Sequence, residues 1–161
     1  MSNETAIPGS FWQRRVVQPI LAQLRQGITP EKLALTLALG LTLAMFPVLG
    51  TTSILCFLAG LAFRLNQPVI QLVNWLAYPL QLSLLLVFIR LGEKLCGASP
   101  VPFSIPDLMA RFKQAPGKFL AEFGMTGLHG ILGWGLVALV LVPGLYYGLL
   151  PLLRKLRQNA D

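Results

Sequence analysis

The sequence predicts an all-α integral membrane protein, built from broken or re-entrant membrane helices with amphipathic interfacial helices beside them. Of its 161 residues, 55% are hydrophobic and only 12% are charged, whereas an average soluble domain has about 25% charged residues. Three stretches contain no Asp, Glu, Lys or Arg, at residues 33–63, 65–89 and 123–153. The net charge of +7 fits attraction to anionic lipid head groups better than nucleic-acid binding, which would place the charge on polar faces.

Residues 11–26 are expected to form an interfacial helix. Phe11 and Trp12 open this segment, and further apolar residues are mixed with arginines, as in helices that lie at the depth of the lipid head groups. Pro19 would kink such a helix. The alternative, a helix that only packs on the bundle, stays open both here and for the amphipathic residues 107–123.

Residues 30–64 are expected to form a broken or re-entrant hairpin. As one continuous helix, the uncharged run 33–63 would be about 46 Å long at 1.5 Å per residue, but the hydrocarbon core of a bilayer is about 30 Å thick. Pro47 and Gly50 interrupt the run near its middle, because proline removes a backbone donor and glycine permits unusual backbone angles. The run therefore crosses once with a strong kink, or it enters and returns as two arms of about 13 residues.

Three local patterns mark helix starts. Residues 29–31 are Thr-Pro-Glu, the order of a capping residue, a first-turn proline and a first-turn acid. The hydroxyl residues 51–53 follow Gly50 directly and are expected to cap the second arm. Residues 66–68, Asn-Gln-Pro, start the next element in the same way. Lys and Arg occur on every connection, so simple crossings leave no side depleted in them, which favours the hairpin.

Residues 68–95 are expected to form a kinked membrane helix, with Pro79 well inside it. Gln71, Asn74 and Tyr78 are spaced three and four residues apart, so they share a helix face. One interpretation is a polar seam that lines a substrate path. The other is a set of interhelical hydrogen bonds, worth about 0.6 kcal/mol each on average, that hold the bundle together.

The rest of the chain is expected to complete a single membrane domain over residues 1–161. We expect a loop with an amphipathic helix at residues 98–122, a membrane helix at 123–153 and a basic tail at 154–161. Close helix packing is the favoured explanation for a set of glycines near the start of this membrane helix, because small residues let helices approach. The set comprises Gly124, Gly127, Gly130, Gly133 and Gly135.

The sequence offers little material for enzyme chemistry. It has no nucleophile elbow, no paired carboxylates and no acidic metal motif. Cys56 and Cys96 lack CxxC spacing, and His129 stands without carboxylate or cysteine partners in the sequence. We therefore expect a protein that is not an enzyme, with no catalytic residues, no metal, no cofactor and no nucleic-acid partner.

A series of short motifs follows in order between residues 27 and 97. It comprises Gly27-Ile28-Thr29-Pro30, Ala38-Leu39-Gly40, Phe46-Pro47-Val48-Leu49-Gly50-Thr51-Thr52, Arg64-Leu65-Asn66-Gln67-Pro68, Asn74, Tyr78-Pro79 and Leu91-Gly92-Glu93. This series resembles the bacterial membrane family called domain of unknown function 2062. The resemblance implies an inner-membrane location in Gram-negative bacteria. It also implies a connection with glycosyltransferases, to which the domain is fused in some proteins.

These observations favour a small, multi-pass inner-membrane protein that binds or moves an anionic lipid or a polyprenyl phosphate. The second arm would start inside the membrane, where the positive end of its dipole can hold an anionic group. The alternative is a membrane scaffold or anchor that recruits a protein partner such as a glycosyltransferase, or a second copy of itself. The residues expected to bind the substrate are Pro47, Gly50, Thr51, Thr52, Ser53, Arg64, Asn66, Gln71, Asn74 and Tyr78.

Overall fold

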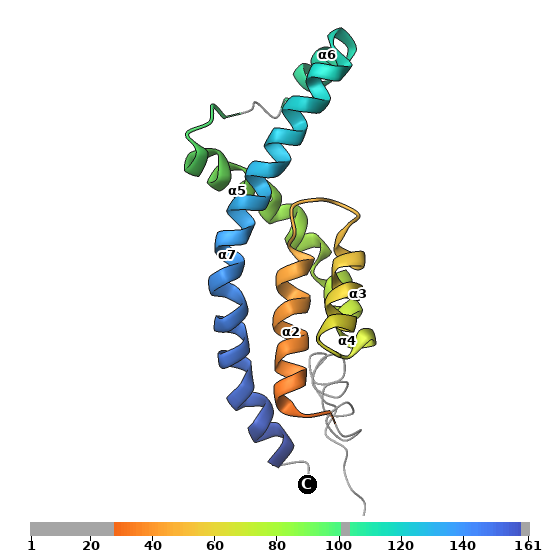
Figure 1. The fold of residues 1–161 in the computed structure, drawn as a ribbon, viewed down its shortest axis with the longest axis vertical. Helices are drawn as coiled ribbons and strands as arrows, with labels where there is room; N and C mark the ends of the chain where they lie inside the picture. Colours follow the sequence, from red (N-terminus) through yellow and green to blue (C-terminus); the bar gives the residue numbers. More distant parts are fainter. Residues whose placement is uncertain (1–27, 101–103, 159–161) are drawn as a thin grey trace, which may run out of the picture.

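The structure, a computed structural model, describes residues 28–100 and 104–158 (Figure 1). The predicted all-α class is confirmed for these residues, which hold helices and no strand. The interfacial helix predicted at residues 11–26 lies outside the described residues. The described helices are α2 (Pro30–Ala44), α3 (Thr52–Ala62), α4 (Gln67–Leu76), α5 (Tyr78–Cys96), α6 (Ile105–Gln114) and α7 (Pro116–Gln158).

Helices α2 and α3 lie side by side and run in opposite directions (Figure 1). Residues 45–51 form the turn between them, and Gly50 takes a φ of +83°, a conformation that glycine adopts without a steric penalty. The predicted break at Pro47 and Gly50 is therefore present, and the chain reverses there instead of continuing as one kinked helix. The arms are unequal, with 15 residues in α2 and 11 in α3, or about 22 and 16 Å at 1.5 Å per residue.

All three predicted helix starts are present, and two of them carry the predicted side-chain cap. The Thr29 hydroxyl caps α2 by accepting a hydrogen bond from the Lys32 backbone N–H at 3.3 Å, with Pro30 in the first turn. The Asn66 side chain caps α4 by accepting a hydrogen bond from the Val69 backbone N–H at 3.0 Å. At both starts a side chain takes up a backbone donor that the helix itself leaves without a partner.

Helices α4 and α5 are bent by 65° relative to each other, and Ala77 lies between them. Pro79 occupies the first turn of α5, where its ring would clash with the Trp75 carbonyl if one helix ran straight through. Helix α4 packs on α2 and α3, and Cys56 and Ile70 are buried where these helices meet. Helix α5 leaves this group and packs mainly on α7.

Helix α7 is longer than the sequence predicts. The expected boundary between a loop helix and a membrane helix at residues 122–123 is absent, because α7 begins at Pro116 and continues to Gln158. The break lies earlier, at Ala115 between α6 and α7, since proline cannot donate a helical hydrogen bond and disfavours helical angles in the residue before it. The basic residues 154–157, expected in a tail, belong to the last turns of α7.

Two glycines allow α5 and α7 to cross in close contact. A Cβ on Gly92 of α5 would collide with the His129 carbonyl of α7, and a Cβ on Gly133 of α7 would collide with the Phe88 carbonyl of α5. The predicted packing role is confirmed for Gly133, and also for Gly130, where a Cβ would lie 3.2 Å from the Ile89 side chain. The remaining glycines of the set face open space: Gly124, Gly127 and Gly135.

Much of the apolar surface of α7 is not covered by the rest of the described chain. In its most apolar 18-residue window only 11% of the residues are buried, and Leu139 and Val140 are each 74% exposed. Among the described residues, α7 is the one helix that is long and apolar enough to cross a membrane. The bent pair α4 and α5 is a second candidate if it counts as a single span.

Candidate functional site

The turn between α2 and α3 meets the bend between α4 and α5. Gln81 near the start of α5 donates from Nε2 to the Phe46 carbonyl at 2.8 Å. Asn74 near the end of α4 donates from Nδ2 to Ser53 Oγ at 3.0 Å. Gln81 is 1% exposed and Asn74 is 4% exposed. We call the place defined by Phe46, Ser53, Asn74 and Gln81 the break junction, because both helix interruptions lie there.

Helix α7 closes the break junction from the other side. Trp134 donates from Nε1 to the Thr42 carbonyl at 2.9 Å, and its ring meets Phe46 edge to face with the ring centroids 4.9 Å apart. Pro47 packs against Gly130, where a Cβ would lie 3.3 Å from the proline Cβ. The end of a helix leaves carbonyls without intrahelical donors. Trp134 of α7 gives the Thr42 carbonyl a second donor besides the Met45 N–H, and Gln81 of α5 donates to the Phe46 carbonyl just beyond the end of α2.

The start of α3 has no side-chain cap, which corrects the prediction that the hydroxyls of residues 51–53 cap it. Thr51 lies at the capping position, but its backbone is helical, with φ −92° and ψ −17°. Its hydroxyl points back and donates to the Val48 carbonyl at 2.9 Å. In the described part of the chain, the backbone N–H groups of Thr52, Ser53 and Ile54 have no hydrogen-bond partner, and the first turn of α3 contains no acid.

Two of the predicted polar residues converge on this helix start. The Gln71 side chain donates from Nε2 to the Ser53 carbonyl at 3.0 Å, and Asn74 bonds the Ser53 hydroxyl. The prediction of interhelical hydrogen bonds is therefore confirmed for Gln71 and Asn74. Tyr78 does not join them, because it follows the bend, begins α5 and is half exposed. The proposed seam on one continuous helix face is wrong for this residue.

Arg64 and Asn66 do not belong to the break junction. They follow the C-terminal end of α3, and the helix separates them from Thr52 by about 16 Å. Asn66 is occupied as the cap of α4. Arg64 is exposed and takes a φ of +52° where the chain leaves α3. Of the residues predicted to bind the substrate, the structure therefore places those of the turn and of α4 near the start of α3.

The sequence does not predict the contact of Trp134 with Thr42 beside the break junction, whereas Gln81 belongs to the polar residues that follow Asn74 in the second uncharged stretch. Gln81 carries a detectable signal, because a glutamine within an otherwise apolar helix needs a hydrogen-bond partner. Trp134 and Thr42 carry none, since their contact joins residues 92 positions apart. The Thr42 hydroxyl and the Asn74 Oδ1 are buried and without a hydrogen-bond partner among the described residues.

No cluster typical of a metal centre accompanies the break junction. Among the described residues, no three His, Cys, Asp or Glu side chains lie close enough together to hold a metal ion. The ion pair Arg90–Glu93 connects two residues of α5 at 2.9 Å, and the Glu93 side chain is 2% exposed. His129 contributes its backbone carbonyl to the contact with Gly92. The polar groups at the break junction are amides, hydroxyls, an indole and backbone groups.

The fold thus defines an all-helical protein with an interrupted helical hairpin and a long, largely uncovered apolar helix. The sequence profile of a family described as uncharacterized protein conserved in bacteria (DUF2062) matches residues 13–161. The chain belongs to this family. The match extends the predicted resemblance, which covers residues 27–97, through α6 and α7. No curated protein and no solved structure matches the chain.

Proposed function

We propose that this protein is a multi-pass integral protein of the bacterial inner membrane that binds the phosphate group of an anionic lipid or a polyprenyl phosphate at the start of α3. One observation carries the binding proposal. Three adjacent backbone N–H groups, those of Thr52, Ser53 and Ile54, have no partner among the described residues. The scaffold alternative makes no use of these donors.

The uncovered surface of α7 supports the membrane location. A core helix of a soluble protein would be mostly buried, whereas the most apolar window of α7 is 11% buried. With 43 residues, α7 is about 64 Å long at 1.5 Å per residue, more than the roughly 30 Å of a hydrocarbon core. In a bilayer, lipid chains would cover these exposed side chains, so their apolar surface would not contact water.

The lengths of α2 and α3 support a re-entrant hairpin. Neither arm reaches the roughly 30 Å needed to cross the hydrocarbon core, and the antiparallel arrangement returns both outer ends to one side. Lys32 and Arg64 lie near these ends, where long cationic side chains can reach the head groups. Broken backbone is tolerated at membrane depth where protein covers it. Gln81 and Trp134 provide such cover at the turn.

The electrostatics of the α3 start support an anionic ligand. Its partial positive charge is equivalent to roughly half an elementary charge, and N–H groups at such an end point toward the ligand. A first-turn carboxylate would compensate this charge, as Glu31 does in α2, but α3 has none. Discontinuous membrane helices in transporters use such ends to hold anionic substrate groups.

Asn74 provides a second, independent indication of a ligand near this helix start. Its side chain is almost fully buried and donates to Ser53 in the first turn of α3, while its Oδ1 has no partner among the described residues. A buried polar atom without a partner costs about 1–3 kcal/mol. A head-group hydroxyl, or a water held by the head group, would supply the missing donor after a small movement of the turn.

A lipid-contact measurement tests the proposal in bilayers. Trp12→Phe and Trp75→Phe leave Trp134, which contacts Phe46 of the break junction, as the reporter. Its fluorescence is quenched by brominated phosphatidylglycerol or by brominated phosphatidylcholine in mixed vesicles. We expect preferential quenching by the anionic lipid. Thr51→Asp should reduce this preference by roughly two- to thirtyfold, since helix-terminus charge interactions are worth about 0.3–2 kcal/mol.

Two further variants separate the backbone donors from the threonine side chain. Thr51→Val removes the hydroxyl that bonds Val48 but leaves the three N–H groups, so the preference for anionic lipid should persist. Thr51→Asn can accept from an N–H group without carrying a charge, so it should have an intermediate effect. Equal quenching by both lipids in the parent protein would contradict the proposed site and leave the scaffold role as the better explanation.

A further inference from the structure

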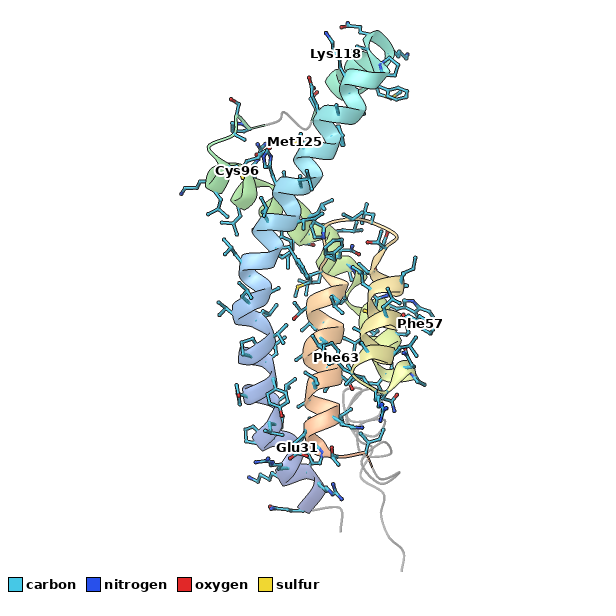
Figure 2. The ribbon with its side chains drawn as sticks, in the orientation of Figure 1. Glu31, Phe57, Phe63, Cys96, Lys118 and Met125 are labelled. Carbon is cyan, nitrogen blue, oxygen red and sulfur yellow. The ribbon has the colours of Figure 1, made fainter. Side chains whose placement is uncertain are left out.

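A second surface of interest lies at the opposite end of α2, where α2 meets the C-terminal part of α7. The two helices form an open groove of about 340 Å³. Glu31 marks its position beside the end of α7 in Figure 2. The residues that line the groove are Glu31, Lys32, Leu35, Val142, Pro143, Tyr146 and Tyr147. We call it the α2–α7 groove.

The α2–α7 groove is apolar on its floor and polar at one end. Leu35 lies one helical turn beyond Glu31, and together with Val142 and Pro143 it makes up the apolar part of the lining, which we call the floor. Tyr146 is partly buried against the cluster of Leu33, Ala34 and Leu153, which fixes this wall of the groove. Tyr147 is 70% exposed. An apolar floor with tyrosines toward its charged end has the polarity of a membrane interface.

The two charged residues at the rim of the groove, Glu31 and Lys32, differ in whether a described residue pairs with them. The Glu31 Oε1 accepts two hydrogen bonds from Arg154, from Nε at 3.0 Å and from Nη2 at 2.9 Å. A hydrogen bond from its own backbone N–H, and then this pairing, lower the pKa of Glu31, and Arg154 balances its charge. Lys32 is exposed, and its ammonium has no partner among the described residues. Lys155 and Arg157 add positive charge in the last turn of α7.

We infer that the α2–α7 groove holds one acyl chain of an anionic phospholipid whose phosphate is bound by Lys32. The apolar floor takes the chain, and the Lys32 ammonium, which no described residue pairs, takes the phosphate oxygens at the polar end. The inference rests on the membrane location in the proposed function, but it is independent of the start of α3. A lipid here would fill the space between α2 and α7 as a retained component of the fold, not as the ligand of the break junction.

Native mass spectrometry of the complete, delipidated chain in detergent tests this inference with added phosphatidylglycerol. We expect one tightly retained lipid per chain. Near a membrane surface each Lys or Arg contributes about 1 kcal/mol to binding anionic lipid, so Lys32→Gln should weaken retention roughly fivefold and Lys32→Glu about thirtyfold. Neither change removes the cap of α2, because Thr29 bonds the backbone N–H of residue 32.

Lys155→Glu is the matched control, since it makes the same change of charge at an exposed residue that does not line the groove. It should keep the lipid. Leu35→Trp, which fills the floor without changing charge, should lose it. Equal loss in the Lys32→Glu and Lys155→Glu proteins, equal retention of phosphatidylcholine, or displacement by inorganic phosphate would each overturn the inference. Thr51→Asp should leave this lipid in place, which distinguishes the two sites.

Discussion

Helices α2 and α3 begin with the same residue type but use it in opposite ways. Thr29 turns its hydroxyl toward α2 and accepts from the Lys32 N–H, whereas Thr51 turns its hydroxyl away from α3 and donates to the Val48 carbonyl. Glu31 adds a carboxylate to the first turn of α2, and α3 has no acid there. The backbone N–H groups at the start of α2 therefore already face a hydroxyl and a carboxylate, whereas those at the start of α3 are available to an anion.

The backbone before each threonine explains the difference. Thr29 is extended, with φ −71° and ψ 147°, the geometry from which a capping side chain reaches the N–H groups of the first turn. Thr51 is already helical, because the tight turn through Gly50 brings the chain to α3 at another angle. A hydroxyl in that position reaches a preceding carbonyl instead. The turn, held in place by α5 and α7, decides the chemistry of the helix start.

The largest effect should come from releasing that turn. Gln81→Leu removes the donor to the buried Phe46 carbonyl, and an unsatisfied buried acceptor costs about 1–3 kcal/mol. We expect a clear fall in the thermal unfolding midpoint in detergent. In vesicles, brominated phosphatidylglycerol should no longer quench Trp134 fluorescence more strongly than brominated phosphatidylcholine does. The start of α3 would then no longer differ from an ordinary frayed helix end.

Gln71→Leu provides the comparison for this change. Gln71 also donates to a backbone carbonyl, that of Ser53, but the bond is exposed, so water can replace the lost donor. Its effect on the unfolding midpoint should be well below that of Gln81→Leu. Equal, small losses in both variants would mean that the Gln81 bond does not hold the turn.

A smaller effect should separate the two threonines directly. Thr29→Ala removes a side-chain cap, which typically costs about 1 kcal/mol, whereas Thr51→Ala removes a hydroxyl that caps nothing. We therefore expect the unfolding free energy, measured by reversible denaturation in micelles, to fall more for Thr29→Ala. A larger fall for Thr51→Ala would show that the Thr51 hydroxyl stabilises the start of α3 after all.

The contrast between the two helix starts also shows which features of the fold can be predicted from neighbouring residues alone. The starts of α2 and α4 follow from residues 29–31 and 66–68, because a cap depends on neighbours within one turn. The break at Pro47 and Gly50 also follows from local chemistry, since both residues act on their own backbone. The direction of the Thr51 hydroxyl does not, because it depends on a turn held by residues far along the chain.

The residues of the candidate site also fall into two groups, those that local sequence places and those that only tertiary packing brings together. Gln71 and Asn74 could be placed on one helix face from their spacing, and both reach Ser53. Arg64 could be placed at the far end of α3 from the sequence, because the predicted second arm begins at residues 51–53 and ends near residue 64. Trp134 could not be included, because only tertiary packing brings α7 against the Thr42 carbonyl. The ends of the helices can be predicted from local sequence, whereas the contacts between those ends depend on tertiary packing.

The smallest effect should come from titrating the start of α2. Its own backbone N–H, and then Arg154, lower the pKa of Glu31 below the usual value of 4.5. A carboxyl group with a lowered folded-state pKa adds stability above the unfolded-state pKa, and this contribution is lost as the pH falls through the folded-state value. The contribution is small because the Glu31–Arg154 pair is exposed and solvent screens it.

Unfolding midpoints of the parent protein and of Glu31→Gln, measured from pH 7 down to pH 3, test this expectation. The parent should be slightly more stable near pH 7, and the difference should shrink below pH 4.5 as Glu31 takes up a proton. Thr51→Asp should gain a comparable pH dependence, because it places a carboxylate at the start of α3 as Glu31 does in α2. If Thr51→Asp showed no such dependence, the new carboxylate would not have reached the N–H groups, and the start of α3 would be less accessible than the contrast with α2 requires.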